Sequence, residues 1–458
     1  MKMQLSEIAR MTGAKNETEQ WATVEVTSVA FDARELRPGA LFVPLAGNRD
    51  GHDFINQARE NGAVATLWAS ARDDQPTDFP VLLVKDPLAA YQQLAKRYLL
   101  KINPKVVAIT GSNGKTTTKD MTAAVLGSQY NIHKTQANFN NEIGVPQTIL
   151  SMEANTEILV IEMGMDRPGQ LHALSEIAMP DVAAITMIGE AHIEFFKTRD
   201  KIADAKMEIT DFLKEDGLLV YDGDEPLLNE RVGDLERETF GSATTNTLYP
   251  IQVRAGETKT QFKLNAWPDV AFEIPMMGAY NVNNTLAAIL IGQHYHIKPE
   301  VMSKALANFE VTRNRTEWLV GTAGQRMLSD VYNSNPTAAI EVLRNFSHFE
   351  TDGRRIAVLG DMLELGTASK KLHESLATVL DPAQIQEVYL FGTEIKPLFD
   401  KLATIYPAEQ LHYFEKTQQP ELITALAETI QPSDLVVLKA SHGLHLEKVV
   451  AALTTEND

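Results

Sequence analysis

One stretch, residues 106–126, constrains the fold of this chain more than any other; it reads VVAITGSNGKTTTKDMTAAVL. Its first five residues are apolar or β-branched, as in a buried parallel strand. From Thr116 onward, Ala, Val and Leu recur at helical spacing. The stretch therefore predicts a strand, a glycine-containing turn and a helix, which is the setting of a phosphate-binding loop.

The turn carries groups suited to a nucleoside triphosphate. Gly111 and Gly114 let the backbone curl so that successive N–H groups point inward, and Lys115 adds a cation for the terminal phosphates. Thr116 offers a hydroxyl to Mg²⁺ at the start of the helix. The general pattern has a further glycine where this chain has Ile109, so the loop is a shortened form, G-x-x-G-K-T-T. The bland alternative is an ordinary turn with a solvated lysine, and the strand before and helix after it argue against that. The predicted nucleotide contacts in this loop are Gly111, Ser112, Asn113, Gly114, Lys115, Thr116 and Thr117.

Length and composition bound what the rest of the chain can be. At 458 residues it is too long for one ordinary core and suggests roughly three domains. The formal net charge of -19 argues against a general affinity for nucleic acid or an anionic membrane. There are no cysteines, so disulfides, thiolate nucleophiles and thiolate metal sites are excluded.

Targeting signals are not evident in the sequence. The first 15 residues, MKMQLSEIARMTGAK, carry charge where a signal peptide needs an apolar core. Nowhere does the chain have about 18 consecutive apolar residues. We therefore expect a cytoplasmic protein that does not insert into membranes.

Residues 1–99 alternate short apolar runs with helical patterns, which predicts a small α/β domain. Four basic side chains in it lie near turn glycines and are suited to an anionic ligand. Ordinary solvated loops explain them equally well on composition alone. These side chains are Arg34, Arg37, Arg49 and His52. Residues 101–105, KINPK, are expected to link this domain to the next.

Residues 100–312 contain the phosphate loop and a further alternation of strands and helices. Glu162 ends the apolar run 158–161, and a carboxylate at such a strand end is suited to Mg²⁺. A solvated strand-end glutamate is the alternative. His192, next to Glu194 and close to a predicted strand end, is either a ligand or a satisfied core histidine.

Lys206 lies in a stretch whose spacing makes it unusual. If residues 201–213 are helical, Ile202, Ile209 and Leu213 form an apolar stripe, and Lys206 falls on that stripe. A lysine there must snorkel to solvent, pair with a carboxylate or be chemically altered. Spacing alone favours snorkelling.

Two amides precede a run of Leu, Ala and Ile that predicts a buried helix. Asn281 and Asn284 lie one helical turn apart, and such side chains cap a helix or hydrogen-bond a base edge. Capping explains one of them better than both.

From about residue 313 the alternation restarts, which predicts a second α/β sheet. Three stretches at its strand ends, 329–338, 359–366 and 438–447, carry more polar detail than a fold needs. Each of them is also explained by loop chemistry alone.

Taken together, these stretches resemble the Mur ligase family over nearly the whole chain. The resemblance does not depend on one motif, and the family's phosphate loop explains the missing glycine at Ile109. The motifs that carry it are TGSNGKTTT (110–118), NFNNEIGVPQT (138–148), IEMGM (161–165), GEAHIE (189–194), AKMEI (205–209), YNVNN (280–284), NRTEW (314–318), DVYNSNP (330–336) and GDMLELG (360–366), with DAR (32–34), RPGALFVPL (37–45) and DGHDF (50–54) in the first domain.

The resemblance implies a fold and an activity. The fold is α/β in three domains: a central P-loop ATPase-like domain with a mostly parallel sheet (100–312), a small uridine-nucleotide-binding α/β domain (1–99) and a doubly wound C-terminal α/β domain (313–458). The type most resembled ligates D-alanyl-D-alanine to UDP-N-acetylmuramoyl-tripeptide with ATP, through an acyl phosphate, as a monomer. Another carboxylate-amine ligase, of MurE or folylpolyglutamate type, is the nearest alternative. A nucleotide-gated binding protein is a more distant one.

The resemblance also implies roles for particular residues. Two Mg²⁺ ions are expected, held by Thr116, Glu162, His192 and a carbamylated Lys206, so the preference at Lys206 turns from snorkelling to modification. Lys115, Glu162, His192 and Lys206 are the expected catalytic residues. The remaining implied contacts are Asn281, Asn284, Arg315 and Asp330 for the nucleotide, and Asp32, Arg34, Asn138, Asn140, Asn141, Asn333 and Asn335 for the substrate.

Five positions depart from the family's usual residues. Ala33 stands in place of a serine whose hydroxyl is expected to face the uridine nucleotide, and Tyr280 stands in place of a commoner histidine. The others are Met187 for asparagine, and Ala440 and His442 for glycine and arginine. We expect these changes to alter individual contacts without altering the fold.

Overall fold

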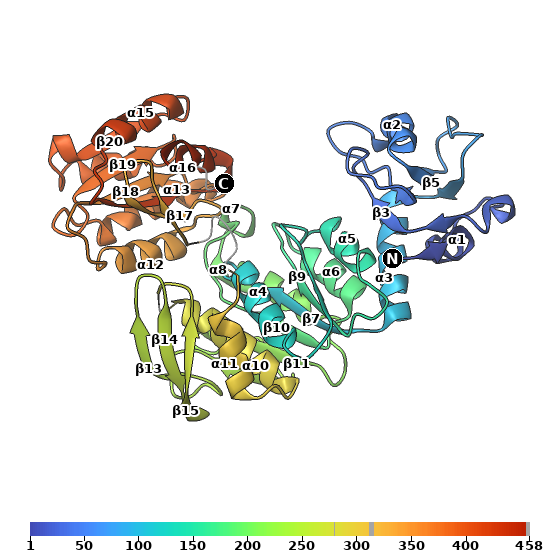
Figure 1. Cartoon of the computed structure of the whole chain (residues 1–458), viewed down its shortest axis with the longest axis horizontal. Helices are drawn as coiled ribbons and strands as arrows, with labels where there is room; N and C mark the ends of the chain where they lie inside the picture. Colours follow the sequence, from blue (N-terminus) through green and yellow to red (C-terminus); the bar gives the residue numbers. More distant parts are fainter. Residues whose placement is uncertain (279, 311–315, 455–458) are drawn as a thin grey trace. The chain divides into compact units, whose positions relative to one another are not determined.

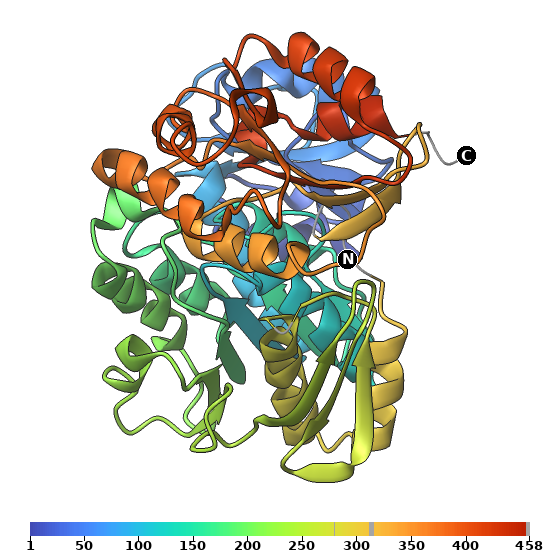
Figure 2. The ribbon, with the colours of Figure 1, turned by 90° about the vertical axis from the view of Figure 1, so that its left-hand side faces the viewer.

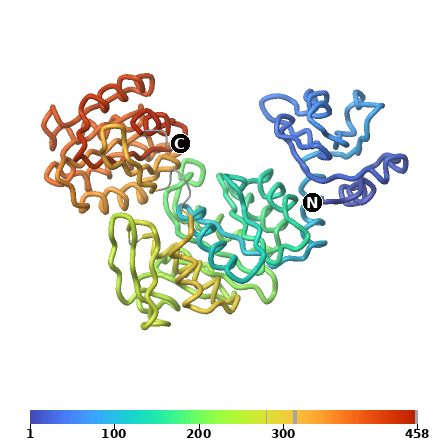
Figure 3. Tube along the Cα trace, viewed as in Figure 1, coloured from blue at the N-terminus to red at the C-terminus, as the bar shows by residue number. Residues whose placement is uncertain are grey.

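The computed structural model describes residues 1–278, 280–310 and 316–454 of the chain (Figures 1 and 3). The chain divides into two compact units. One comprises Met1–Thr110, Gln129–Ala184 and Met207–Leu219, and the other comprises Gly111–Ser128, Ile185–Lys206 and Val220–Asp458. Among the described residues, no helix combines the length and the apolarity needed to cross a bilayer.

The N-terminal part is built on a parallel sheet with the strand order β3-β4-β5-β6. Asp86 caps the long helix α3 by accepting from the backbone of Leu88 at 2.8 Å. The helix ends where Asn103 takes a left-handed conformation, so only two residues of the expected linker 101–105 lie between α3 and β7. The elements are β1 Met3–Gln4, α1 Leu5–Thr12, η1 Glu19–Trp21, β2 Glu25–Val26, β3 Ser28–Ala30, β4 Ala40–Phe42, η2 Gly51–Phe54, α2 Ile55–Glu60, β5 Ala63–Ala69, β6 Val81–Val84 and α3 Pro87–Ile102.

The middle part contains a six-stranded sheet with the order β12-β11-β10-β7-β9-β8. Its central strands are apolar runs buried on both faces, as expected where helices cover a parallel sheet. Helix α4 starts at Lys115, within one residue of the predicted start. The elements are β7 Lys105–Thr110, α4 Lys115–Leu126, β8 Ile132–Lys134, α5 Gly144–Leu150, β9 Ile158–Glu162, α6 Gln170–Ala178, β10 Val182–Ile185, α7 Ile193–Phe196, α8 Arg199–Met207, η3 Glu208–Thr210, β11 Leu218–Asp222, α9 Pro226–Asn229 and β12 Arg237–Phe240.

An antiparallel three-stranded sheet, β13-β14-β15, follows and was not expected from the sequence. In Figures 1 and 2 its strands run side by side in yellow-green. Helix α11 packs against β15, and helix α10 packs against α4. The elements are β13 Pro250–Ala255, β14 Thr260–Leu264, β15 Trp267–Ile274, α10 Tyr280–His294 and α11 Pro299–Ala307.

The C-terminal part is a second six-stranded sheet, with the order β16-β17-β21-β18-β19-β20. Only β16 is antiparallel to its neighbour. Apolar residues of α12 and α14 pack on one face, and those of α15 and α16 pack on the other. This is the predicted doubly wound arrangement. The elements are β16 Glu317–Val320, β17 Arg326–Asp330, α12 Pro336–Phe346, β18 Arg355–Gly360, η4 Gly366–Ala368, α13 Ser369–Ser375, η5 Leu376–Val379, β19 Glu387–Phe391, α14 Lys396–Leu402, η6 Ala408–Gln410, β20 Leu411–Phe414, α15 Gln419–Thr429, β21 Leu435–Lys439, η7 His442–Leu444 and α16 Glu447–Leu453.

One helix differs from its expected extent. The apolar stripe predicted a helix over residues 201–213, but α8 ends at Met207 and a 3-10 turn follows it. Leu213 therefore lies outside the helix, whereas Ile202 and Ile209 are fully buried as the stripe requires.

Candidate active site

The phosphate loop connects β7 to α4 and is shaped by two glycines with positive φ. Gly111 has φ +154° and Gly114, which precedes α4, has φ +80°. Lys115 Nζ donates to the carbonyl oxygen of Gly111 at 2.9 Å, so the ammonium group lies over its own loop. The start of α4 adds backbone N–H groups and the positive end of a helix dipole. These are the features that a polyphosphate requires.

Residues 186 and 187 hold the loop through its backbone. Ser112 N donates to the carbonyl oxygen of Met187 at 2.9 Å, and Thr186 Oγ1 donates to the carbonyl oxygen of Asn113. Asn113 Nδ2 also lies 3.8 Å from Sδ of Met187. Because the main contact of Met187 uses its carbonyl oxygen, methionine at this position leaves that contact intact.

The two amides of α10 brace the loop from another side. Asn281 Nδ2 donates to the carbonyl oxygen of Met277 at 2.9 Å, and Asn284 Nδ2 donates to Asn281 Oδ1 at 3.1 Å. Asn284 Oδ1 in turn accepts from Thr118 Oγ1 at 3.4 Å. A Cβ added to Gly114 would lie 2.2 Å from this same oxygen. Asn281 and Asn284 therefore connect α10 to the phosphate loop through consecutive hydrogen bonds. This chain of hydrogen bonds needs both amides.

Helix α12 of the C-terminal sheet reaches the same region. Asn335 Oδ1 caps α12 by accepting from Ala338 N at 3.0 Å, and its Nδ2 donates to Asn113 Oδ1 at 2.8 Å. Thr337 Oγ1 donates to Glu190 Oε2 at 2.7 Å. Asn335 is thus brought to the phosphate loop.

Asp330 is paired with a lysine that the sequence reasoning did not single out. Lys439 Nζ lies 2.5 Å from Asp330 Oδ2 and donates to the carbonyl oxygen of Asn333 at 2.9 Å. The side chain of Lys439 is 2% exposed, so this is a buried ion pair. A lysine that ends the apolar strand β21 was the signal that could have revealed it.

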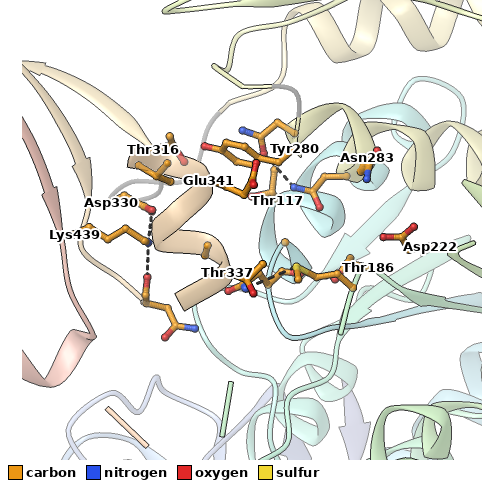
Figure 4. A pocket seen from close by; sticks show the side chains of 18 of the residues that line it. Thr117, Thr186, Asp222, Tyr280, Asn283, Thr316, Asp330, Thr337, Glu341 and Lys439 are labelled. Carbon is orange, nitrogen blue, oxygen red and sulfur yellow. Dashed lines mark hydrogen bonds and ion pairs between the residues drawn. The ribbon is translucent and has the colours of Figure 1, made fainter. Parts of the chain in front are cut away.

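A cavity of about 440 Å³ lies against the loop, a volume suited to a small-molecule ligand (Figure 4). Figure 4 shows Asp330 and Lys439 on one side of it and Thr186 and Asp222 on the other. All of its lining residues belong to one compact unit. They are Asn113, Gly114, Thr117, Thr186, Met187, Asp222, Ser242, Tyr280, Asn281, Asn283, Asn284, Thr316, Asp330, Asn333, Thr337, Ala338, Glu341, Val342 and Lys439.

Two titratable side chains of the cavity are perturbed by burial. Burial raises the pKa of Asp222 to about 7. Burial also raises the pKa of Tyr280, whose hydroxyl oxygen makes no hydrogen bond of regular geometry among the described residues. A buried hydroxyl at a cavity wall is a group that a bound ligand can satisfy.

Lys206 is buried in α8, with a relative exposure of 3%. Snorkelling, the interpretation that spacing alone favoured, is therefore wrong, because the amine does not reach solvent. Burial lowers the pKa of Lys206 well below its usual value, and the positive charge of Lys115 lowers it further. Among the described residues, no carboxylate forms an ion pair with its amine.

His192 precedes α7 and is paired with a residue from the motif GDMLELG. Its Nδ1 lies 2.5 Å from Glu364 Oε2, and this contact holds the pKa of Glu364 below its usual value. The ring is not aligned for a hydrogen bond of regular geometry. Glu364 was not among the predicted site residues.

Glu162 ends β9 and belongs to the other compact unit. It is 2% exposed and accepts from Asn140 Nδ2 at 2.8 Å, while its backbone N–H donates to Thr135 Oγ1 at 2.9 Å. A solvated strand-end glutamate, the alternative considered above, is therefore wrong. Asn141 uses its side chain to accept from the backbone of Gly144 at 2.9 Å, at the start of α5.

In the N-terminal domain, some of the residues singled out from the sequence lie on the surface and others are buried. Asp32 and Arg34 pair with each other at 2.6 Å, and the arginine side chain is 78% exposed. Ala33, which stands in place of the family's usual serine, packs in a hydrophobic core cluster. His52 is also buried, and its Nδ1 lies 2.6 Å from Asp50 Oδ1.

The remaining predicted site residues are Asn138, Thr116 and Arg315. Asn138 accepts through its carbonyl oxygen from Asn140 N, and Thr116 is 4% exposed at the start of α4. Arg315 lies outside the described residues. Within the described ranges, no three His, Asp or Glu side chains are grouped so as to hold a metal ion.

Family models match the chain in three consecutive segments. They are the Mur ligase family catalytic domain at residues 25–99, the Mur ligase middle domain at 109–292 and the Mur ligase glutamate ligase domain at 314–442. The chain belongs to the Mur ligase family. The predicted family and the three-domain α/β fold are thereby confirmed, and the protein is an ATP-dependent acid–amino acid ligase of this family.

Individual Mur ligases are similar over the whole length. The UDP-N-acetylmuramoyl-tripeptide--D-alanyl-D-alanine ligase of Bacillus subtilis is 40% identical over 99% of this chain and 98% of its own. The Escherichia coli enzyme of the same name is 32% identical over 97% and 98%. The crystal structure of MurF from Acinetobacter baumannii has a TM-score of 0.86 at 25% identity and covers 98% of each chain. MurF ligase from Thermotoga maritima, solved in complex with ADP, has a TM-score of 0.81 at 29% identity and covers 93% of this chain and 97% of that one.

Proposed function

We propose that this Mur ligase joins D-alanyl-D-alanine to UDP-N-acetylmuramoyl-tripeptide with ATP, giving the pentapeptide precursor of peptidoglycan. The observation that carries the proposal is the full-length identity of 40% with a ligase of that name. The cavity beside the phosphate loop supports it, because a ligase of this kind needs a nucleotide site of that volume. The proposed setting is a monomer in the cytoplasm, with the domains 1–99, 100–312 and 313–458.

The chemistry follows from the difficulty of amide formation in water. The γ-phosphoryl group of ATP passes to a carboxylate oxygen of the tripeptide, ADP leaves, and an acyl phosphate forms. The amine of D-alanyl-D-alanine then attacks the acyl carbon, phosphate leaves with the C–O bond electrons, and the nitrogen loses a proton. Lys115 neutralises charge on the β- and γ-phosphates, since positioning and electrostatics dominate phosphoryl transfer.

The nucleotide is proposed to occupy the cavity at the loop. The phosphates lie on the loop residues 111–117, and the base lies towards Tyr280, Asn281 and Asn284. The buried hydroxyl of Tyr280 supports this orientation, because it makes no hydrogen bond of regular geometry among the described residues and a base edge offers one. Asp330 and Arg315 are proposed to contact the ribose and phosphates.

Mg²⁺ fits the donor set, because it is usually held by one or two carboxylates together with substrate phosphates and does not need a cluster of three acidic side chains. Thr116, Glu162, His192 and Lys206 are each proposed as Mg²⁺ ligands. Bound there, the ions would neutralise charge on the phosphates and on the substrate carboxylate. Lys206 is proposed to be carbamylated: its amine is buried, burial lowers its pKa, the neutral amine is the form that adds CO₂, and the carbamate would supply a carboxylate.

The tripeptide substrate is proposed to contact the asparagines around Glu162 and those of the C-terminal domain. The surface pair of Asp32 and Arg34 is proposed to meet the uridine nucleotide. The full set is Asp32, Arg34, Asn138, Asn140, Asn141, Asn333 and Asn335.

The test is phosphate release from ATP in the presence of UDP-N-acetylmuramoyl-tripeptide, with D-alanyl-D-alanine, lysine, D-glutamate or no amine. We expect release that depends on the dipeptide, and a product heavier than the tripeptide substrate by the dipeptide less water. Release with a single amino acid instead would favour the MurE-type alternative. Nucleotide binding without dependence on any amine would overturn the proposal.

A further inference from the structure

The turn that carries His192 is seated on the loop 360–366 of the C-terminal domain. Both segments belong to the same compact unit. Helix α7, which starts directly after His192, packs against η4, which starts at Gly366. This loop was one of three polar stretches that the sequence marked, and the ligase mechanism above gives it no role.

Two contacts beside His192 fix the turn. The side chain of Ile193 packs against the hydrophobic core cluster that contains Met362 and Leu365. The backbone N–H of Glu194 donates to the carbonyl oxygen of Glu364 at 2.9 Å. A Cβ on Gly366 would lie 3.0 Å from Glu194, so the two backbones approach closely. The turn is therefore anchored by apolar burial and by a backbone hydrogen bond.

The backbone on each side of this contact is unusual. His192 has φ +62° and Glu364 has φ +61°, a conformation that costs free energy for residues other than glycine. Such residues persist where the surrounding structure holds them, and they cluster at functional sites. Here the two strained residues face each other, and their side chains meet at 2.5 Å.

We propose that Glu364 is a positioning residue for His192, a role that rests on the proposed ligase function. The Glu364 carboxylate lies 2.5 Å from Nδ1, and its negative charge favours the imidazole proton on that nitrogen even though the contact is not a hydrogen bond of regular geometry. The lone pair is then left on Nε2. The carboxylate also limits rotation of the ring. The loop 360–366 thereby gives His192 its tautomer and its orientation, so the ring is ready for a ligand only while the turn is seated on the loop.

Kinetics with matched variants test this role. Glu364→Ala is expected to lower kcat about 10- to 100-fold, the range seen when a partner of a functional histidine is removed, with KM for ATP unchanged. Glu364→Gln keeps an acceptor for Nδ1 and is expected to recover part of that loss. Glu409→Ala removes an exposed carboxylate of the same domain and should match the unaltered enzyme.

A double-mutant cycle shows whether Glu364 acts through His192. His192→Ala is expected to lower kcat, and adding Glu364→Ala to it should change kcat by less than about twofold, because the partner is already absent. Losses that multiply would overturn the proposal, as would a Glu364→Ala enzyme with normal kcat. A wild-type enzyme that shows no dipeptide-dependent turnover would instead count against the proposed function.

Nitrogen NMR of the histidine side chains gives a readout besides activity. His192→Ala assigns the signal, and we expect the Nδ1-protonated tautomer in the unaltered protein. Glu364→Ala should shift that signal towards the other tautomer, while thermal unfolding midpoints confirm that each variant is folded. An unchanged tautomer in a folded Glu364→Ala protein would overturn the proposal.

Discussion

Asn335 donates from Nδ2 to Oδ1 of Asn113 at 2.8 Å, across 222 positions of sequence. One residue of the C-terminal domain thereby holds the phosphate loop while its Oδ1 caps α12. The Nδ2 donor of Asn335 therefore contacts the loop and its Oδ1 acceptor caps α12, and a substitution that removes only one of these groups can distinguish the two roles.

Asn335→Asp keeps the oxygen that caps the helix but replaces the donor with a negative charge beside the loop. We expect the thermal unfolding midpoint to change little, because Asp and Asn cap equally well. KM for ATP should rise about tenfold or more, because the donor is lost and the new charge repels phosphate. Asn335→Ser, which loses the donor without adding charge, should show a smaller rise. An unchanged KM in both variants would contradict a role at the loop.

Lys115→Ala should reduce turnover severely while leaving unfolding cooperative. The ammonium group neutralises phosphate charge in the transition state, so its loss should lower kcat/KM by about 10²- to 10³-fold. Lys416→Ala, which removes an exposed lysine elsewhere, serves as the control in the same phosphate-release assay. Substantial activity in the Lys115 variant would mean that another cation does this work.

Lys206→Ala should lower kcat at least about 100-fold and should be rescued in part by short-chain carboxylic acids. The acid would replace the carboxylate that a carbamate supplies. Burial lowers the pKa of Lys206, which favours the neutral amine that carbamylation requires. Lys201→Ala on the same helix, where the side chain is 67% exposed, is the matched control. Unchanged activity in the Lys206→Ala variant would contradict the proposed role of Lys206 as a carbamylated metal ligand.

Asp222 predicts a pH dependence of stability. Its pKa is raised from 3.8 to about 7 in the folded protein, so the folded state disfavours the ionised form. Stability is then fully present below pH 3.8 and is lost as the pH rises through about 7. Asp222→Asn should therefore raise the free energy of unfolding by about 1 to 4 kcal/mol at pH 8 and by much less at pH 4. Denaturant melts at the two pH values measure this, and an equal effect at both would contradict the assigned pKa.

Gly114→Ala tests the close approach of Asn284 to the loop. The substitution combines a positive φ with a Cβ only 2.2 Å from Asn284 Oδ1. Gly169 has φ +85° with nothing within 4 Å, so Gly169→Ala reports the backbone cost alone, about 1 kcal/mol. We expect Gly114→Ala to cost clearly more in unfolding free energy and to lower activity. An equal loss of unfolding free energy in the two variants would show that the Asn284 side chain moves aside without a cost in free energy.

The sequence predicts those features that depend on local pattern. β7, the loop and α4 follow from an apolar run, two glycines and a helical repeat. The burial of Lys206 was not predicted, because its place on an apolar stripe favoured snorkelling to solvent. The sheet β13-β15 was missed although β14 alternates buried and exposed side chains, and its edge strand β13 is largely exposed, with Ile251 50% exposed. The surrounding α/β pattern dominated the interpretation.

Contacts between residues that are far apart in the sequence could not be predicted from local sequence patterns. Nothing near His192 indicates that its partner is Glu364, and nothing near Asp330 indicates Lys439. Both pairs depend on how the C-terminal sheet places its strand ends. The extent of α8 was also wrong, since a 3-10 turn after Met207 leaves no mark in the spacing of apolar residues.

The cavity of about 440 Å³ draws its walls from stretches as far apart in sequence as Asn113 and Lys439. A small molecule that fills it would tie those stretches together, and its binding free energy would be added to the stability of the folded chain. Inhibitor discovery against this enzyme can therefore begin from melting temperature alone, before any uridine-linked substrate has been synthesised.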